Sequence, residues 1–387
     1  MSLVFMLLSY FSAIFTISAS PIGQPRKEIH RRSLATRDTT VQFSEIDASF
    51  TLGAAESKVA ASGTYPRLAR LSDGGILSIA TFQDGSDRVL RVSRSDDDGG
   101  SFTEIGEVAR STGDLDNGYL LQLPSGTILA AFRNHDKNAD GALTYFRITV
   151  CSSTDGGRTW VFAAQAAENA ASASGFNGLW EPFLRLGGDG AVQLTYSGEL
   201  SQTNQETFRA LSRDEGKTWS APANLRLHGD RTDQRDGMQG IVSVQDAGSG
   251  QETLVMVFEV KEGNYVHLAT VTSTNDGESW GSRSTIFQAA NHNAGAPQIA
   301  SVGNNLAVVF MTDEDTDASS LNWPDKATIK MIFSSELRGG QLDWTTQTLK
   351  LSDASAYWPG AFQRASNDII AVYERGGTPY GKVVSAA

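Results

Sequence analysis

Two glutamates in this chain stand where carboxyl groups could carry out acid–base chemistry. The apolar neighbours of Glu181 in the segment Leu179–Phe183 would raise its pKa and keep it protonated, as a general acid requires. Glu259 follows the apolar run Leu254–Phe258, which predicts an acid at the end of a buried strand. A proton donor paired with a second carboxylate is what hydrolysis of a glycosidic bond needs. The competing structural interpretations are a carboxylate on a turn for Glu181 and a solvated strand-end charge for Glu259.

Glu374 is the main rival to Glu259, because it ends a similar apolar run, Ala371–Tyr373. Aromatic faces and polar side chains at comparable positions could hold sugar rings, and arginines could hold hydroxyls or orient carboxylates. His135 also has a plainer interpretation as a polar loop residue. The candidate substrate-binding residues are Tyr65, Arg67, Asn117, Asn134, His135, Trp180, Arg235, Tyr357, Trp358, Glu374 and Arg375.

A strand–turn–strand pattern recurs along the chain and would bring these scattered residues together. It reads Y-P-R-L-A-R-L-S-D-G-G-I-L from Tyr65 and E-P-F-L-R-L-G-G-D-G-A-V from Glu181. The other copies begin at Asn117, Gln239, Ala296 and Trp358. In a β-propeller the innermost strands of all repeats begin around one mouth of a channel, so equivalent positions converge. We therefore expect the glutamates, arginines and aromatic residues to line one mouth.

A second motif, the octapeptide S-T-D-G-G-R-T-W of Ser153–Trp160, recurs between these segments. Close copies cover Ser95–Phe102, Ser212–Trp219 and Ser273–Trp280, and a worn copy ends at Trp344, at intervals of about sixty residues. A short acidic side chain can accept hydrogen bonds from the backbone of a tight turn, and glycine supplies the positive φ such turns need. We therefore predict that these aspartates clasp hairpins and take no part in catalysis.

The two repeated patterns together predict the fold class. Short alternating or apolar runs separated by turn residues, with no convincing amphipathic helix, indicate an all-β chain. Six copies of the strand–turn–strand pattern predict a six-bladed β-propeller with no internal domain boundary. A β-sandwich, the alternative fold, gives no reason for a repeat of this length.

The N-terminal segment predicts secretion. Residues 1–20 carry no charge and contain an apolar run too short for a membrane span, followed by small residues, which is typical of a signal peptide. A membrane anchor is the alternative. Residues 21–38 form a short basic segment that includes Arg31-Arg32, typical of a pro-segment or linker. We expect residues 39–387 to be the catalytic propeller of a secreted, extracellular protein.

Composition narrows the possible partners. The formal net charge of −12 opposes binding to nucleic acid or to an anionic membrane surface. The single cysteine, Cys151, excludes an intramolecular disulfide, and no Cys/His cluster has metal-ligand spacing. We expect a monomer without metal or cofactor whose partner is an oligosaccharide.

The chain resembles the Asp-box (BNR-repeat) β-propellers, to which sialidases belong, through the octapeptides. G-T-Y-P-R-L-A-R-L-S-D-G from Gly63, G-L-W-E-P-F-L from Gly178 and R-D-G-M-Q-G from Arg235 look more specifically like fungal glycoside hydrolase family 93. That resemblance implies a secreted, six-bladed exo-α-L-arabinanase that releases arabinobiose from plant α-1,5-arabinan with retention. It assigns Glu181 as the acid/base and Glu259 as the nucleophile. Gln239 departs from the pattern, since the other repeats lead us to expect proline there.

Two alternatives to an arabinanase follow from the same residues. A sialidase would use three arginines to bind the substrate carboxylate, and Arg67, Arg235 and Arg375 could form such a triad. However, Tyr65-Pro66-Arg67-Leu68 replaces the Arg-Ile-Pro motif of sialidases. The third class is a non-catalytic sugar-binding propeller, favoured if Glu181 and Glu259 fail to face each other.

Overall fold

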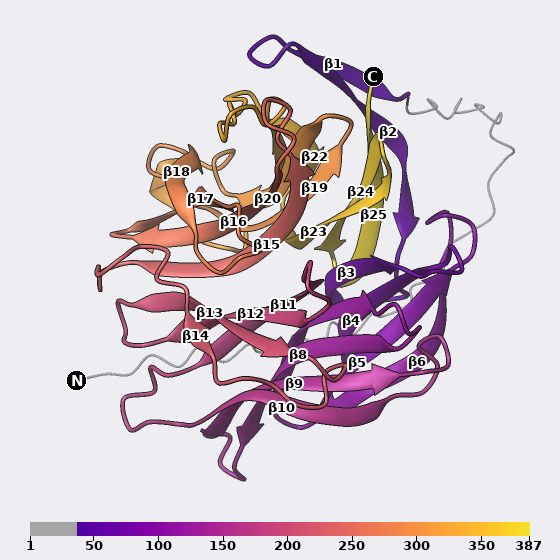
Figure 1. The fold of residues 1–387 in the computed structure, drawn as a ribbon, viewed down its shortest axis with the longest axis vertical. Coiled ribbons are helices and arrows are strands. Elements are labelled where there is room, and N and C mark those ends of the chain that lie inside the picture. Colours follow the sequence, from indigo (N-terminus) through magenta and orange to yellow (C-terminus); the bar gives the residue numbers. More distant parts are fainter. Residues whose placement is uncertain (1–36) are drawn as a thin grey trace, which may run out of the picture. The chain divides into compact units, whose positions relative to one another are not determined.

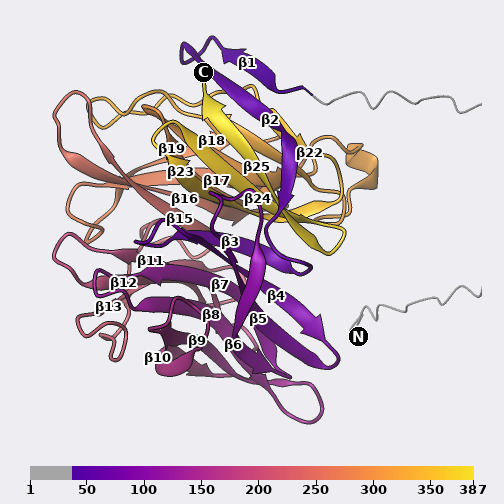
Figure 2. The same ribbon diagram turned by 90° about the vertical axis from the view of Figure 1, so that its right-hand side faces the viewer.

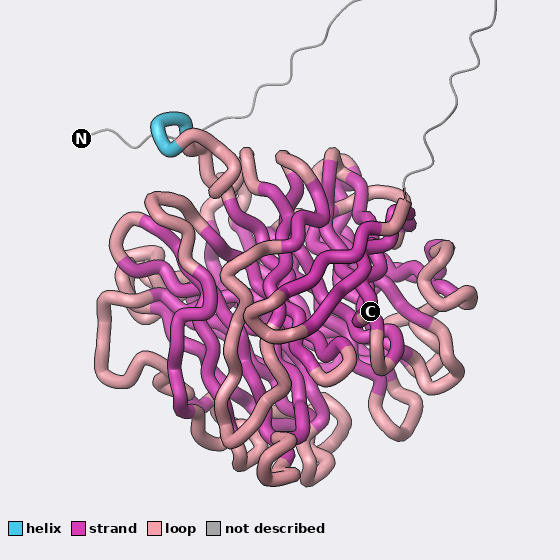
Figure 3. Tube along the Cα trace, turned by 90° about the horizontal axis from the view of Figure 1, so that it is seen from above, coloured by secondary structure: helices cyan, strands magenta, loops and turns pink. Residues whose placement is uncertain are grey.

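The computed structural model describes residues 37–387 as strands and turns. The one short helix in this range is the 3₁₀ turn η1 (Ala318–Ser320), which lies in the long loop after β20 (Asn305–Thr312) and is drawn in cyan in Figure 3. The all-β prediction is therefore confirmed. The predicted signal peptide and nearly all of the basic segment 21–38 lie outside the described residues. Within the described range, no helix is long and apolar enough to cross a membrane.

The strands form five hydrogen-bonded sheets. One contains β1 (Thr39–Phe43), β2 (Ala48–Lys58), β25 (Thr378–Ala386), β24 (Asp368–Arg375) and β23 (Ala356–Ala365). The next contains β3 (Thr64–Arg70), β4 (Ile76–Asp84), β5 (Asp87–Ser95) and β6 (Thr103–Ser111). A third contains β7 (Asp114–Gln122), β8 (Ile128–Lys137), β9 (Leu143–Ser153) and β10 (Val161–Ala170). A fourth contains β19 (Ala294–Val302), β20, β21 (Thr328–Phe333) and β22 (Leu349–Ser352).

The fifth sheet has seven strands on its main path and an eighth paired beside them, and its middle joint is weak. Its strands are β11 (Leu179–Leu186), β12 (Val192–Glu199), β13 (Gln205–Ser212), β15 (Arg235–Gln245), β16 (Glu252–Glu262), β17 (Tyr265–Ser273) and β18 (Gly281–Phe287), with β14 (Ala223–Asn224) paired to β13. A single parallel pair, Gln205 with Arg235, joins β13 to β15. On either side of that pair the strands form antiparallel groups like those of the other sheets.

The first strands of these groups contact one another in a closed cycle. The contacts run from β3 to β7, then to β11, β15, β19 and β23, and from β23 back to β3. Figure 2 labels these strands, and their colours follow the sequence from indigo at β3 toward yellow at β23. Such a cycle agrees with the predicted convergence of the repeats, and the number of blades remains a prediction.

The two ends of the described chain meet in one sheet. β2 runs antiparallel to β25, from the pair Phe50–Ala386 to the pair Lys58–Tyr380, and Figures 1 and 2 show the indigo and yellow strands side by side. Phe50 also stacks on Phe333, with ring centroids 3.7 Å apart. The N-terminal strand thus completes a sheet made from the C-terminal strands, which resists opening of the cycle at that point.

Each first strand carries a β-bulge at the same place. The residue in the bulge has a φ between 51° and 57° in all six strands, a left-handed conformation that is uncommon for residues other than glycine. A bulge re-aims the side chain it carries. These residues are Tyr65, Asn117, Glu181, Met238, Ala296 and Trp358. The fourth repeat is therefore centred on Met238, a correction of the predicted start at Gln239. Gln239 stands where four of the other five repeats have proline.

The octapeptide aspartates clasp hairpins, as predicted. Asp155 accepts hydrogen bonds from the backbone N–H of Thr159 (2.9 Å) and from its hydroxyl (2.6 Å), and these bonds hold the pKa of Asp155 well below its usual range. Asp214 bonds Thr218 in the same way. The Trp160 indole N–H donates to the carbonyl of Gly157, so the closing aromatic residue is tied to the same turn.

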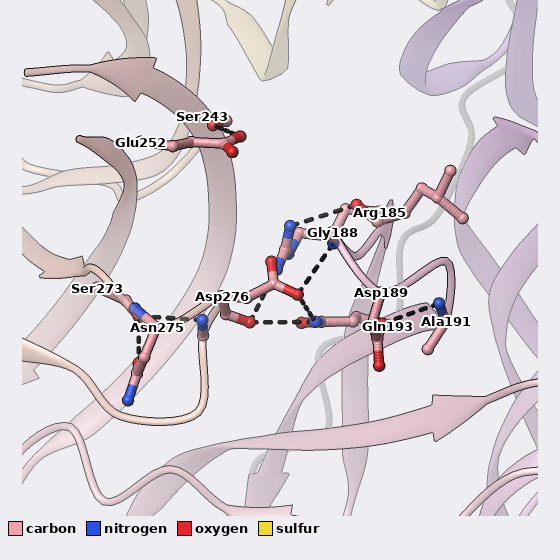
Figure 4. A network of polar contacts seen from close by, with 12 residues as sticks. Arg185, Gly188, Asp189, Ala191, Gln193, Ser243, Glu252, Ser273, Asn275 and Asp276 are labelled. Carbon is pink, nitrogen blue, oxygen red and sulfur yellow. Dashed lines mark hydrogen bonds and ion pairs between the residues drawn. The ribbon is translucent and has the colours of Figure 1, made fainter. Parts of the chain in front are cut away.

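One of these hairpins also ties one strand group to the next. Asp276, beside the clasp residue Asn275, forms an ion pair with Arg185 of β11. Its carboxylate also accepts from the Gly188 N–H (3.1 Å) and from the Gln193 amide (3.0 Å), as Figure 4 shows. The hairpin between β17 and β18 is therefore fastened to the turn between β11 and β12.

Candidate active site

Glu181 occupies the bulge of β11, with a φ of 52°. Its Oε2 accepts hydrogen bonds from the Met238 backbone N–H (2.9 Å) and the Ser197 hydroxyl (3.0 Å). The Gln239 side-chain amide donates to the Glu181 carbonyl (2.8 Å). Side chain and backbone of Glu181 are thus held from β12 and β15.

Glu259 lies on β16, directly opposite Gly237 of β15. Its Oε2 accepts a hydrogen bond from the Ala296 backbone N–H at 2.7 Å. Ala296 is the bulge residue of β19, so the bulge of the next group supplies the donor. The same relation holds for Glu181, whose carboxylate bonds the bulge residue Met238.

Gly237 lies between the two carboxylates. A Cβ atom placed on Gly237 would be 2.9 Å from the Gln205 amide nitrogen, 3.3 Å from Oε2 of Glu181 and 3.6 Å from Oε1 of Glu259. The two carboxylate oxygens can therefore be no farther apart than the sum of their two distances. The absent side chain keeps open a space that both carboxylates and the Gln205 amide border, and it is there that a reacting atom could sit.

Burial raises the pKa of both carboxyls. For Glu181 burial outweighs the hydrogen bonds from Met238 and Ser197, which act in the opposite direction. For Glu259 burial is the largest cause of the shift and repulsion from Glu181 is the next, and together they raise its pKa to about 7. Two interacting carboxyls titrate as a pair rather than as independent groups. Such a pair can hold one proton near neutral pH, as acid–base catalysis requires.

Glu374 does not adjoin Glu181. It lies opposite Tyr357 on β24, the same place that Glu259 has on β16. Its carboxylate accepts a hydrogen bond from the backbone N–H of Gly377, and burial raises its pKa. Gly237, which borders the Glu181 carboxylate, lies opposite Glu259 and not opposite Glu374. Of the two sequence candidates, Glu259 is the partner of Glu181.

An aromatic wall extends from the carboxylate pair. The Tyr65 hydroxyl donates to the Met238 sulfur (3.4 Å), and the Tyr65 ring lies 6.2 Å from that of Trp358. Trp323, which the sequence analysis missed, comes from the long loop between β20 and β21. A Cβ on Gly295 would be 2.6 Å from Oε2 of Glu259 and 3.1 Å from the Trp323 ring. This ring is therefore close to Glu259.

The three predicted arginines have separate partners. Arg235 forms an ion pair with Glu199 (2.6 Å), and Arg375 forms one with Glu56 (2.7 Å). Arg67 is buried, donates to the carbonyls of Pro66 and Trp358, and lies over the Tyr65 ring. Two of the three charges are therefore already neutralised by carboxylates.

Another predicted substrate-binding residue, His135, lies in the interior of the protein. His135 is 0% exposed and bonds the Leu179 carbonyl through Nε2 (2.7 Å). It packs edge-on against Trp180, and burial lowers its pKa to about 4. The structure therefore corrects the prediction that His135 contacts substrate. Its ring packs against Trp180 and bonds the backbone of β11.

Two further predicted substrate-binding residues, Asn134 and Tyr357, form hydrogen bonds within the protein. Asn134 donates to Thr149 (3.2 Å), and the Tyr357 hydroxyl donates to the Asp325 carbonyl (2.8 Å). Asn117 is a buried bulge residue whose side-chain carbonyl makes no hydrogen bond within the described part of the chain. The bond from Tyr357 anchors the loop that carries Trp323.

Sequence reasoning missed several polar residues around the carboxylate pair. Ser197 stands opposite Trp180 as Glu259 stands opposite Gly237, so the repeat register could have identified it. Gln239 departs from the proline pattern because its amide holds the Glu181 backbone. Arg133, whose guanidinium lies 5.1 Å above the Trp180 ring, is the equivalent of Ser197 on β8. Among residues 37–387, no cluster of His, Cys, Asp and Glu could hold a metal ion.

Comparisons with known proteins identify the fold. No family model matches the chain, and no curated protein matches it in sequence. An α-L-arabinofuranosidase, Arb93A, from Fusarium graminearum superposes with a TM-score of 0.64 at 19% identity, over 84% of this chain and 92% of that one. An α-L-arabinanase from Penicillium chrysogenum, complexed with arabinobiose, gives 0.60 at 17% identity, over 85% and 94%.

A protein of unknown function from Dyadobacter fermentans is similar to the same extent, with a TM-score of 0.62 at 13% identity, over 91% of this chain and 98% of that one. A further Fusarium graminearum structure, a family GH93 α-L-arabinofuranosidase with arabinobiose, gives 0.58 at 18% identity, over 84% and 92%. The resemblance predicted from the sequence motifs is thereby confirmed for the fold: over 84–85% of its length the chain folds like the solved arabinose-acting enzymes of glycoside hydrolase family 93.

Proposed function

We propose that this protein is a retaining glycoside hydrolase that acts on α-1,5-linked L-arabinan. The observation that carries the proposal is the space at Gly237, bordered by the carboxylates of Glu181 and Glu259. The fold shared with enzymes solved in complex with arabinobiose supports the choice of sugar. The resemblance of the sequence motifs adds exo cleavage with release of arabinobiose.

The separation of the carboxylates supports retention. Retaining glycosidases have carboxyl groups about 5–5.5 Å apart, whereas inverting enzymes need roughly 6.5–9.5 Å to admit a water. The upper limit set by 3.3 and 3.6 Å excludes most of the inverting range. Direct attack by one carboxylate on the anomeric carbon is the mechanism that fits.

In the proposed first step Glu181 gives its proton to the leaving glycosidic oxygen. Glu259 attacks the anomeric carbon, the C–O bond to the leaving group breaks, and a glycosyl ester forms. In the second step Glu181 removes a proton from water, which displaces Glu259 and restores both groups. Trp323, Tyr65 and Trp358 are proposed to form the platform for the sugar rings.

The chain architecture proposed with this function is a six-bladed propeller. The closed cycle of first strands, the six equivalent bulges and the single joint between β13 and β15 support it. We further propose that the protein is secreted, on the basis of residues 1–20, and acts as a monomer on plant cell-wall arabinan.

The alternative functions are less well supported. A sialidase needs free cationic groups around the substrate carboxylate, and Arg235 and Arg375 are paired with Glu199 and Glu56. A non-catalytic sugar-binding protein gives no reason for two buried carboxyls that border one space. Burying such a pair costs stability, which binding a neutral sugar alone would not require.

Product analysis on linear α-1,5-arabinan, run beside an α-sialoside, tests the proposal. We expect arabinobiose from arabinan, no sialic acid, and initial products with retained anomeric configuration by NMR. Glu259→Ala should abolish turnover and leave substrate binding in place. Sialic acid release, or near-normal rates for Glu259→Ala, would contradict the assignment.

A further inference from the structure

A buried cluster of charges that the proposed mechanism does not use lies beneath the start of β15. His228 bonds Asp236 through Nδ1 (3.0 Å) and Glu206 through Nε2 (3.1 Å). Arg283 of β18 binds both oxygens of Asp236, at 2.8 and 2.9 Å. The side chains of His228 and Asp236 are fully buried, and that of Glu206 is nearly so.

This cluster is connected to the carboxylate pair by short steps. Asp236 directly precedes Gly237, and its carbonyl accepts a hydrogen bond from the Gln205 amide (2.8 Å). The other end of the Gln205 amide accepts from Arg235 (2.8 Å). Arg235 is among the groups that lower the pKa of both Glu181 and Glu259. The conformation of residues 235–237 therefore sets the position of the Arg235 guanidinium and the width of the space between the two carboxylates at Gly237.

A second connection leads to Glu259 itself. The Arg283 guanidinium lies 4.8 Å above the ring of Phe258, which is 0% exposed and directly precedes Glu259. Arg283 therefore contacts Asp236, which precedes Gly237, and Phe258, which precedes Glu259.

The charges of the cluster balance only when His228 is protonated. Asp236 and Glu206 supply two negative charges, and Arg283 and His228 supply two positive ones. A buried charge without a partner is strongly destabilising. The nearby titratable groups on packed elements are His267 on β17 and Asp233 in the loop before β15. Burial lowers the pKa of His267, so it does not take over the role of His228.

We propose that the cluster of His228, Asp236, Glu206 and Arg283 is a positioning device that fixes Gly237 and Arg235 between the two carboxylates. None of the four residues borders the space at Gly237, so their effect passes through the backbone of β15 and through Phe258. The proposal rests on the proposed function for its kinetic consequences, but the placement of Arg235 can be measured without substrate.

The substrate-free measurement is a carboxyl-carbon NMR titration of protein labelled in glutamate. In His228→Gln and Asp236→Asn we expect the pKa of Glu259 to rise, because Arg235 is no longer held where it favours the ionised form. Arg283→Lys keeps the charge but loses the paired hydrogen bonds, so we expect a smaller shift. Arg213→Gln is the matched control, because it breaks a solvent-exposed ion pair with Asp189.

The kinetic measurement uses the same variants on arabinan oligosaccharides, with rates corrected for the folded fraction. A misplacement of about 1 Å costs about 10²-fold in rate, so we expect kcat to fall tenfold or more with KM nearly unchanged. The acid limb of the pH profile should move to higher pH together with the pKa of Glu259.

The outcomes separate the two proposals. If the wild-type protein does not cleave arabinan, the proposed function fails, and the NMR titration still decides the positioning role. If His228→Gln or Asp236→Asn does not fold, Arg283→Lys decides it. Variants that lose thermal stability but keep the Glu259 titration of the wild-type protein would overturn the positioning role.

Discussion

Replacing Glu259 by glutamine should stabilise this protein while removing its activity. Burial and repulsion from Glu181 raise the pKa of Glu259 from 4.5 to about 7, so the folded state opposes ionisation of this carboxyl. A shift of that size corresponds to about 3 kcal/mol above pH 7. Because Glu259 is not fully shielded from solvent, we expect about 2 kcal/mol in practice.

The sign follows from the direction of the shift. The unfolded chain ionises Glu259 above pH 4.5, whereas the folded protein holds the proton until about pH 7, so stability is lost as the pH rises between these values. Glutamine keeps an acceptor for the Ala296 N–H and carries no charge. Urea unfolding of Glu259→Gln and wild type at pH 4 and pH 8 checks this. We expect a difference at pH 8 that nearly vanishes at pH 4; equal differences at both would refute the reasoning.

Further predictions concern the space, its wall, the hairpins and the buried histidine. Gly237→Ala should lower kcat/KM about 10²-fold, because its Cβ enters the space between the carboxylates and displaces the Gln205 amide, 2.9 Å away; wild-type kinetics would contradict this. Trp323→Ala should raise KM about tenfold and change kcat less, if its ring is a sugar platform, as steady-state kinetics will show. Asp155→Ala should lower the melting temperature and leave the rate per folded molecule unchanged. Hydrogen bonds to carboxylates outweigh burial and raise the pKa of His228 to about 9, so its stabilising contribution should be complete below pH 6.5 and disappear as the pH rises through 9, measured by unfolding across that range.

The fold was accessible from the sequence because its signals are local and repeated. The clasp at Asp155 involves residues within five positions along the chain, so the motif itself shows its hydrogen bonds. The strand–turn–strand copies likewise identified strands whose bulges prove equivalent. The register of the fourth repeat was misplaced by one residue, because Gln239 replaces the proline that marks the position in four of the other five repeats.

The partners of the catalytic candidates were less accessible. Ser197 reaches Glu181 from the neighbouring strand β12, and only a comparison of strand registers points to it. Trp323 comes from the loop between β20 and β21, and nothing in its local sequence distinguishes it from an ordinary loop residue. His135 was misjudged because a histidine followed by acidic and polar residues resembles a loop, whereas its ring is buried under Trp180. Burial of a polar side chain depends on what packs over it, which a single sequence does not specify.

The hydrogen bonds that the two carboxylates accept indicate which of them holds the shared proton in the free protein. Hydrogen bonds to a carboxylate favour its ionised form, and Glu181 accepts two whereas Glu259 accepts one. In the free protein these bonds favour a proton on Glu259, the reverse of the state needed for Glu181 to act as the acid. The proposed roles therefore require the proton to move to Glu181 as substrate enters the space between them.

The same bulge recurs six times, yet only at Glu181 does it present a carboxyl. The position of Glu259 is repeated at Glu374, but there the preceding strand places Tyr357 opposite the carboxylate instead of glycine. The backbone thus offers equivalent geometry in every group of strands. A site arises where a glutamate in one bulge, a glycine in the next strand and a second glutamate opposite that glycine occur together.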